Sequence, residues 1–113
     1  MKIKYHGTSE KNQTPNPRIV VMTETPDKVT TERLRYIGSS EPANFPWGYC
    51  GSGPANLAIS ILTDYCKRTG WDPDLAQILY RDFRWDFIDS KPGKLCITDQ
   101  QIEHWLQERV VVV

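Results

Sequence analysis

The sequence predicts a single α+β domain spanning residues 1–113, with a small antiparallel sheet of three to four strands packed against about three helices. A chain of 113 residues has room for one hydrophobic core. Its 39% hydrophobic and 25% charged residues are an ordinary globular balance. Segments with strand patterning come first and segments with helix patterning follow, which is the order typical of α+β domains.

Four short segments are predicted to be strands. Residues 2–6 alternate as Lys, Ile, Lys, Tyr and His, which indicates a half-buried strand. Arg18–Glu24 is rich in β-branched residues and lies between prolines, so it is the second. Thr31–Ile37 is the third, and Leu95–Ile97 is a short fourth.

The first two helices are predicted from apolar spacing and from their ends. Pro54 suits the first turn of a helix that runs to about Arg68, and Gly70 ends it. Its core-facing stripe repeats at helical spacing: Leu57, Ala58, Ile61, Leu62 and Tyr65. Asp72 is expected to cap the second helix, which continues through Phe87.

The third helix is predicted to follow Thr98. Thr98 and Gln101 have the spacing of a capping box, in which each side chain bonds the backbone of the other. Its apolar side carries Ile102, Trp105 and Leu106. The terminal run Val110–Val113 is either an edge strand or a frayed end.

Charge and cysteine usage narrow the classes of function. Lys+Arg and Asp+Glu are equal at 14 each, so the basic excess of a general nucleic-acid-binding protein is missing. The three cysteines lack metal-finger spacing and are read as reduced thiols. The start of the chain does not resemble a signal peptide, and no apolar stretch is long enough for a bilayer. We therefore expect a cytoplasmic protein with no membrane segment, no metal and no cofactor.

A glycine-rich segment before the first helix is the main candidate site. Glycines allow close approach to backbone N–H groups, and the first turn of a helix favours phosphate or carboxylate. A hydroxyl and aromatic rings beside that turn suit a nucleotide-like ligand. The predicted ligand-binding residues are Trp47, Gly48, Tyr49, Gly51, Ser52, Gly53 and Asn56. The alternative is that the glycines only permit a tight loop and the aromatics cover the core.

Known phosphate motifs differ from this segment. Its glycines follow the order G-x-x-G-x-G, whereas dinucleotide-binding turns have G-x-G-x-x-G, and no Gly-Lys-Ser/Thr is present.

Cys50 is a candidate nucleophile at the helix start, but it needs His6 or His104 as a base. The alternative for Cys50 is a small buried hydrophobe. Binding without catalysis is therefore the main expectation, and no catalytic residue is assigned.

The second helix carries more aromatic residues than one buried face needs: Tyr80, Phe83, Trp85 and Phe87. Either two of its faces are buried, or one aromatic edge is exposed for a partner or for self-association. The nearby carboxylates at Asp72 and Asp74 fit a helix start, and Asp82, Asp86 and Asp89 fit a solvated face.

Motifs along most of the chain carry a family resemblance. They are Tyr5-His6-Gly7, the run from Phe45 to Ala58, Leu79-Tyr80-Arg81-Asp82-Phe83, and Trp105-Leu106. The chain resembles a family of small bacterial and phage proteins of unknown function with the pattern Trp-Gly-Tyr-x-Gly-Ser-Gly-Pro-Ala-x-Leu-Ala. The resemblance implies a small domain with a non-enzymatic accessory role, such as binding a host protein or sequestering a host signalling nucleotide. Cys50 stands at a variable position of that pattern, which speaks against a nucleophile.

Three hypotheses follow, and they leave the oligomeric state open. The first is a non-enzymatic binding protein that holds a phosphate-bearing or other anionic small molecule at the start of the first helix. The second is an interaction or inhibitory module that acts on a host protein through the loop at 38–46 or through the aromatics of the second helix. The third is a Cys50-dependent enzyme.

Overall fold

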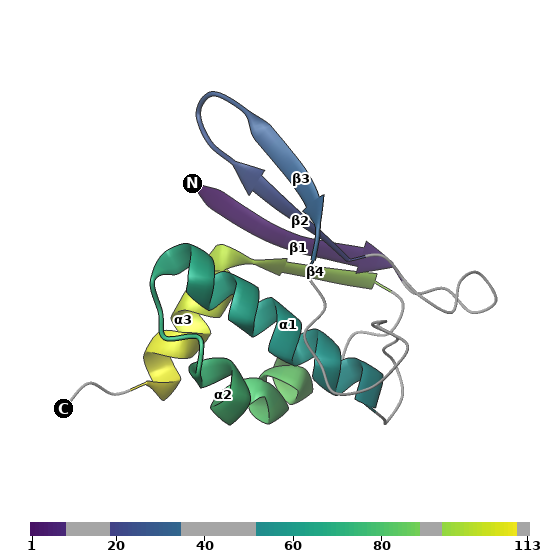
Figure 1. Cartoon of the computed structure of the whole chain (residues 1–113), viewed down its shortest axis with the longest axis vertical. Helices are drawn as coiled ribbons and strands as arrows, with labels where there is room; N and C mark the ends of the chain where they lie inside the picture. Colours follow the sequence, from purple (N-terminus) through teal and green to yellow (C-terminus); the bar gives the residue numbers. More distant parts are fainter. Residues whose placement is uncertain (9–18, 35–51, 89–93, 111–113) are drawn as a thin grey trace.

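The computed structural model describes residues 1–8, 19–34, 52–88 and 94–110, and confirms the α+β class. One four-stranded sheet and three helices form this part of the chain, and the helices all lie on one side of the sheet (Figure 1). The elements in chain order are β1 (Lys2–Thr8), β2 (Ile19–Glu24), β3 (Val29–Arg33), α1 (Ser52–Thr69), α2 (Leu75–Phe83), the π-helical segment η1 (Arg84–Ile88), β4 (Lys94–Thr98) and α3 (Asp99–Arg109).

The sheet is antiparallel throughout, with the strand order β3-β2-β1-β4. Tyr5 in the central strand β1 lies opposite Val21 of β2 and Ile97 of β4, and all three side chains are buried. Their neighbours Lys4 and His6 point to the other face and are exposed. The alternation in β1 therefore reads as predicted, with one face on the core and one in solvent.

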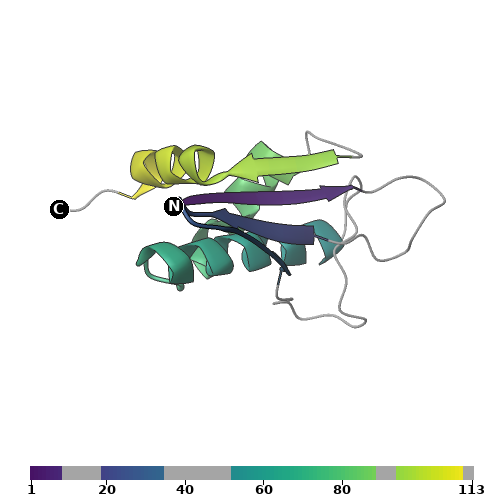
Figure 2. The same ribbon diagram turned by 90° about the horizontal axis from the view of Figure 1, so that it is seen from above.

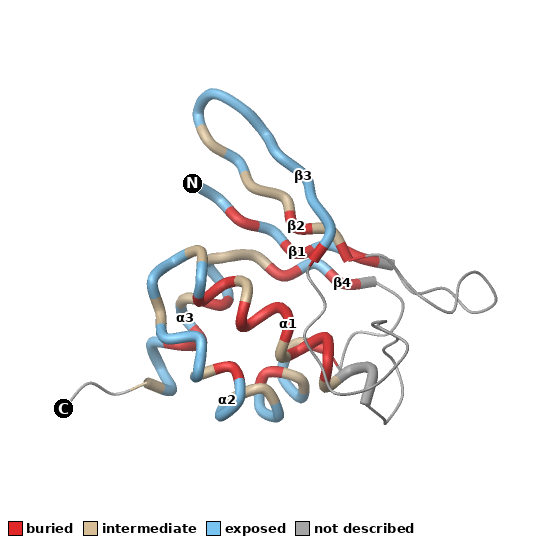
Figure 3. The backbone as a smooth tube through the Cα atoms, in the orientation of Figure 1, coloured by how far each residue is buried: buried red, intermediate tan, exposed pale blue. Residues whose placement is uncertain are grey.

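The third strand lies two residues earlier than predicted. A tight turn ends β2: the Thr25 N–H donates to the Lys28 carbonyl at 2.9 Å, and the Lys28 N–H donates to Thr25 Oγ1 at 3.3 Å. This turn fixes the register, so β3 begins at Val29 and ends at Arg33. Every residue of β3 is exposed, and the β2–β3 hairpin extends away from the helices (Figure 3). Residues 35–37 lie outside the described residues.

Helix α1 forms the centre of the core. The predicted stripe is buried throughout, and its inner side is the long red stretch of Figure 3. The helix begins at Ser52, two residues before the predicted start. It ends at Thr69 because Gly70 adopts φ 89°, a left-handed conformation that glycine reaches without steric cost.

The second helix differs from its prediction at both ends. Asp72 does accept a backbone hydrogen bond, from the Asp74 N–H at 3.0 Å, but the α-helix itself begins at Leu75 after a turn. In that turn the Asp72 carbonyl accepts from the Leu75 N–H at 3.1 Å, so Asp74 becomes the residue that precedes the helix. The predicted continuation to Phe87 is present as a π-helix, which rotates its side chains relative to those of α2.

Helix α3 begins as predicted. Thr98 Oγ1 accepts from the Gln101 N–H at 3.3 Å, and the Thr98 N–H donates to Gln101 Oε1 at 2.9 Å. The three predicted apolar residues of this helix are buried. Figure 2 shows α3 beside the end of β4, from which it directly continues. No helix within the described ranges is long and apolar enough to cross a membrane.

Candidate functional site

Most of the predicted glycine-rich site lies outside the described residues. This applies to Trp47, Gly48, Tyr49, Gly51 and also Cys50. Ser52 and Gly53 lie in the first turn of α1, and the Ser52 side chain is not among those described. Asn56 is buried at 5% exposure, one turn into the helix. The ligand prediction and the Cys50 prediction therefore stay predictions.

The two histidines lie on different elements, and both are exposed. His6 is exposed on the open face of the sheet, directly across from Cys96 of β4. The His104 side chain is 77% exposed, and its Nε2 lies 2.8 Å from Glu108 Oε1 one turn further along α3.

Cys66 and Cys96 are free thiols, and burial raises the pKa of the Cys66 thiol to about 11. Cys66 is therefore protonated near neutral pH and behaves as a small core residue.

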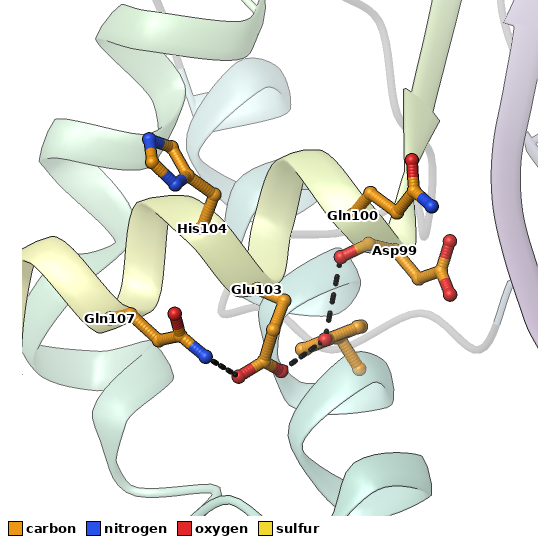
Figure 4. Close-up of a pocket in the computed structure, with 6 residues that line it drawn as sticks. Asp99, Gln100, Glu103, His104 and Gln107 are labelled. Atoms are coloured by element: carbon orange, nitrogen blue, oxygen red, sulfur yellow. Dashed lines mark hydrogen bonds between the residues drawn. The ribbon is translucent and has the colours of Figure 1, made fainter.

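A shallow depression of about 430 Å³ lies between α1 and α3 (Figure 4). Its lining residues are Tyr65, Asp99, Gln100, Glu103, His104 and Gln107. Glu103 accepts from the Tyr65 hydroxyl at 2.5 Å, from Trp71 Nε1 at 3.0 Å and from Gln107 Nε2 at 3.0 Å. His104 points away from Glu103 (Figure 4).

Glu103 has a structural role in this depression. Burial acts to raise the pKa of its carboxyl, but the hydrogen bonds from Tyr65, Trp71 and Gln107 lower it below the usual value. Burial and the bond to Glu103 also raise the pKa of the Tyr65 hydroxyl. The carboxylate thus stays ionised and the phenol stays protonated at neutral pH, so the pair joins α1, α3 and Trp71 and is poorly suited to proton transfer.

A second polar network joins the sheet to α1. The hydroxyl of the buried Tyr5 donates to Asp64 Oδ2 at 2.6 Å, and Arg68 Nε donates to the same oxygen at 2.7 Å. Arg68 also pairs with Glu32 of β3. Burial and the hydrogen bond to Asp64 raise the pKa of Tyr5. This network secures the otherwise exposed strand β3 to the helical layer.

A third cluster joins η1 to α3, and we call it the inner cluster (Asp86, Trp105 and Arg109). Asp86 Oδ2 accepts from Trp105 Nε1 at 2.7 Å and from the Arg109 guanidinium at 2.8 Å. The Arg109 guanidinium carbon also lies 4.3 Å from the centroid of the Trp105 ring. The Trp105 ring packs edge-on against Phe83, with centroids 5.4 Å apart.

A separate group of exposed residues on α2 and η1 is not part of this cluster, and we call it the α2 outer face (Ile78, Arg81, Asp82 and Trp85). Ile78 is 72% exposed and Trp85 is 74% exposed. The spacing i, i+3 and i+4 places Ile78, Arg81 and Asp82 on one side of α2, and Trp85 follows within one turn in η1; all four residues are exposed. Of the two alternatives for the aromatics, Phe83 packs into the core and Trp85 forms the exposed edge.

Sequence reasoning missed Ile78 as part of this face. The signal was available, because Ile78 and Trp85 both fall outside the stripe of Leu75, Leu79 and Phe83, which repeats every four residues. Asp82 has no hydrogen bond or ion pair with any residue that the structure describes. Among the residues that the structure describes, no group of three or more His, Cys, Asp or Glu side chains is placed to hold a metal ion.

The chain was also compared with known proteins. A family model matches residues 5–108, from within β1 to within α3. The chain belongs to DUF6166, a family of unknown function. The DUF6166 match therefore takes in all or part of every described helix and strand, including the whole of α2 and its outer face. Neither the curated proteins nor the solved structures gave a match.

Proposed function

We propose that the protein is a non-enzymatic binding module that acts by contact with another protein through the α2 outer face. The observation that carries the proposal is the exposure of two large apolar side chains on consecutive helical segments, Ile78 of α2 and Trp85 of η1. Large apolar side chains that share an exposed patch commonly mark a protein-interaction site. Tryptophan is also among the residues that contribute most to binding energy at interfaces.

The rigidity of the support favours the same function. The inner cluster and the packing of Trp105 against Phe83 and Phe87, with ring centroids 5.4 Å and 6.0 Å apart, fix α2 and η1 against α3. A face held in this way loses little conformational entropy when it binds, which favours affinity. The π-helical turn at Arg84–Ile88 supports the proposal too, because π-helical segments are frequent at functional sites.

The sequence resemblance suggests the setting. A bacterial or phage protein with an accessory role would meet its partner in a reducing cytoplasm. The free thiols of Cys66 and Cys96 suit such a compartment. The partner class is then a host protein or a further copy of the chain, and one experiment separates these cases.

The test is site-specific photo-crosslinking in the native host. A photo-reactive phenylalanine analogue replaces Ile78 in one variant and Trp85 in another, and Thr30, exposed on β3, serves as the control position. We expect adducts of higher mass from positions 78 and 85 and none from position 30. The mass of each adduct identifies a foreign protein or a second copy. Absence of adducts from both positions 78 and 85 overturns the proposal.

An anionic small ligand at the start of α1 is the second candidate. One observation favours it: α1 has no acidic residue in its first turn, so no side chain of that turn offsets the positive end of the helix dipole. The test is a thermal-shift series with inorganic phosphate, nucleotides and cyclic nucleotides. A ligand at a hundred times its dissociation constant adds ~2.7 kcal/mol, a rise on the order of 10 °C for this size of domain. The rise should disappear in Ser52→Asp, and a flat series rejects the candidate.

A further inference from the structure

The α2 outer face has a symmetric order of chemical types. Along the helix it reads apolar, cation, anion, apolar: Ile78, Arg81, Asp82 and Trp85. The two outer residues are each three positions from the nearer charged residue. When the order is reversed about the midpoint between Arg81 and Asp82, an apolar residue still stands at each end and two opposite charges stand at the centre. Only the positions of the two charges are exchanged.

Arg81 and Asp82, the charged pair at the centre, make few contacts within the part of the chain that the structure describes. Arg81 makes its contacts with the adjacent Tyr80, through Nε to the hydroxyl at 3.2 Å and with the guanidinium carbon 5.6 Å from the ring centroid. Asp82 is exposed and, within the described part of the chain, lacks any partner. By contrast, Asp86 and Asp64 each accept hydrogen bonds from a neighbouring arginine. Asp82 is thus available to a cation from outside the chain.

We propose that the protein forms a two-fold symmetric dimer through the α2 outer face, which rests on the proposed function and names the partner as a second copy of the chain. Two copies of α2 in antiparallel contact place Ile78 of one against Trp85 of the other. The same arrangement places Arg81 of one beside Asp82 of the other, and symmetry repeats both contacts. This is an isologous interface, in which one patch is complementary to itself.

Charge complementarity selects this orientation. In a parallel arrangement of the two helices, Arg81 would face Arg81 and Asp82 would face Asp82, and like charges in contact oppose association. The antiparallel arrangement pairs opposite charges twice and covers both apolar residues of each copy. Specificity for the antiparallel dimer therefore comes from the central charges, and affinity comes from the apolar residues on either side.

The size of the patch sets the expected affinity. Each tryptophan can bury ~150–250 Å², so two tryptophans and two isoleucines give an interface on the order of 800 Å². Stable interfaces usually bury ~1,200 Å² or more, so this dimer is weak and depends on concentration. We expect a dissociation constant on the order of 10–100 μM.

The first experiment is sedimentation equilibrium of the purified full chain from about 1 μM to 1 mM, a range that brackets the expected dissociation constant. We expect a reversible monomer–dimer equilibrium for the wild type. Trp85→Ala should weaken dimerisation by about tenfold or more. A wild-type chain that stays monomeric over the whole range overturns the dimer.

Charge reversal tests the geometry of the dimer. Arg81→Asp and Asp82→Arg should each weaken self-association by about tenfold, because each puts two pairs of like charges at the centre. When the two variants are mixed in equal amounts, the central positions of one copy are both acidic and those of the other are both basic, so a heterodimer should form with near wild-type affinity. The doubly reversed variant, Arg81→Asp with Asp82→Arg, should again form a homodimer. Failure of the mixture to associate, or singles that dimerise like the wild type, rejects this interface.

The two proposals fail in different ways. Foreign-protein adducts from positions 78 and 85, together with a monomeric purified chain, leave the binding face in place and reject the dimer. No adducts and a monomeric chain reject both. Circular dichroism and urea unfolding of each variant at a concentration of about 1 μM, well below the expected dissociation constant, show whether a loss of association reflects misfolding.

Discussion

Two tryptophans of the helical layer, Trp105 and Trp85, have opposite surroundings. Trp105 of α3 is 6% exposed, donates to Asp86 and stacks with Arg109. Trp85 of η1 is 74% exposed. Periodicity places Trp105 on the apolar side of α3, whereas Trp85 falls outside the stripe of Leu75, Leu79 and Phe83. Under the proposed function, the inner cluster serves stability and the α2 outer face serves contact with a partner.

The largest expected effect comes from replacing each tryptophan by alanine. Trp105→Ala should lower the free energy of unfolding by about 3–5 kcal/mol, because it removes a buried ring and the hydrogen bond to Asp86. Trp85→Ala should leave it within about 0.5 kcal/mol of the wild type, since little of the ring is buried. Urea unfolding at low micromolar concentration measures both. Comparable losses in the two variants would show that Trp85 also supports the fold.

How far the sequence predicts this molecule depends on the range of the interactions involved. The capping box of Thr98 and Gln101 and the end of α1 at Gly70 were predicted correctly, because each is settled by residues within one turn of chain. The buried stripe of α1 was also predicted, since helical periodicity carries that information directly. Local chemistry and periodicity are enough for the fold class and most of the core.

The remaining errors come from interactions that sequence spacing does not contain. The start of β3 depends on the turn at Thr25–Lys28, and its exposure is tolerated because Glu32 pairs with Arg68 of α1. Spacing places Ile78 and Trp85 outside the stripe of Leu75, Leu79 and Phe83, but whether a second aromatic face is buried depends on where α3 places Trp105. The ligand prediction for Trp47–Asn56 lies mostly outside the described residues, so it stays a prediction.

An intermediate loss of stability is expected from replacing Glu103 of α3, and Glu108 of the same helix provides the comparison. Glu103→Gln should lower the free energy of unfolding at pH 7 by about 1–2 kcal/mol, because a charged acceptor of three hydrogen bonds becomes neutral while still partly exposed to solvent. Glu108→Gln, at an exposed ion pair with His104, should change it by less than about 0.5 kcal/mol. Urea unfolding again provides the comparison.

The pH dependence of the Glu103 effect has a definite sign. The pKa of Glu103 is lower in the folded state than its ordinary value of 4.5, so ionisation stabilises the fold above that pH. This stabilisation is lost as the pH falls through the folded-state pKa, where the wild type also becomes neutral at this position. The stability curves of the wild type and Glu103→Gln should therefore converge below pH 4.5. Curves that stay parallel from pH 7 downward would place the effect in packing and not in the charge.

The smallest expected change in the free energy of unfolding comes from replacing either of two aspartates that lie one helical turn apart. Asp86→Asn should lower the free energy of unfolding by about 1 kcal/mol, because the pair with Arg109 loses its charge at a partly exposed site. Asp82→Asn should leave the stability of the monomer unchanged within about 0.5 kcal/mol, since no described residue depends on it.

The two aspartate variants should have the opposite order of effect on the dissociation constant of the dimer. Asp82→Asn removes the partner of Arg81 in the second copy and should weaken the dimer several-fold, whereas Asp86→Asn should leave it near the wild type. Stability is measured at a concentration where the chain is monomeric, so that association does not contribute to it. If Asp82→Asn lowers monomer stability as much as Asp86→Asn does, Asp82 serves the fold, and the division between the inner cluster and the α2 outer face does not hold. If the ranks cross between the two assays, Asp86 of η1 serves the fold through α3 and Asp82 of α2 serves the dimer, although only one turn separates them.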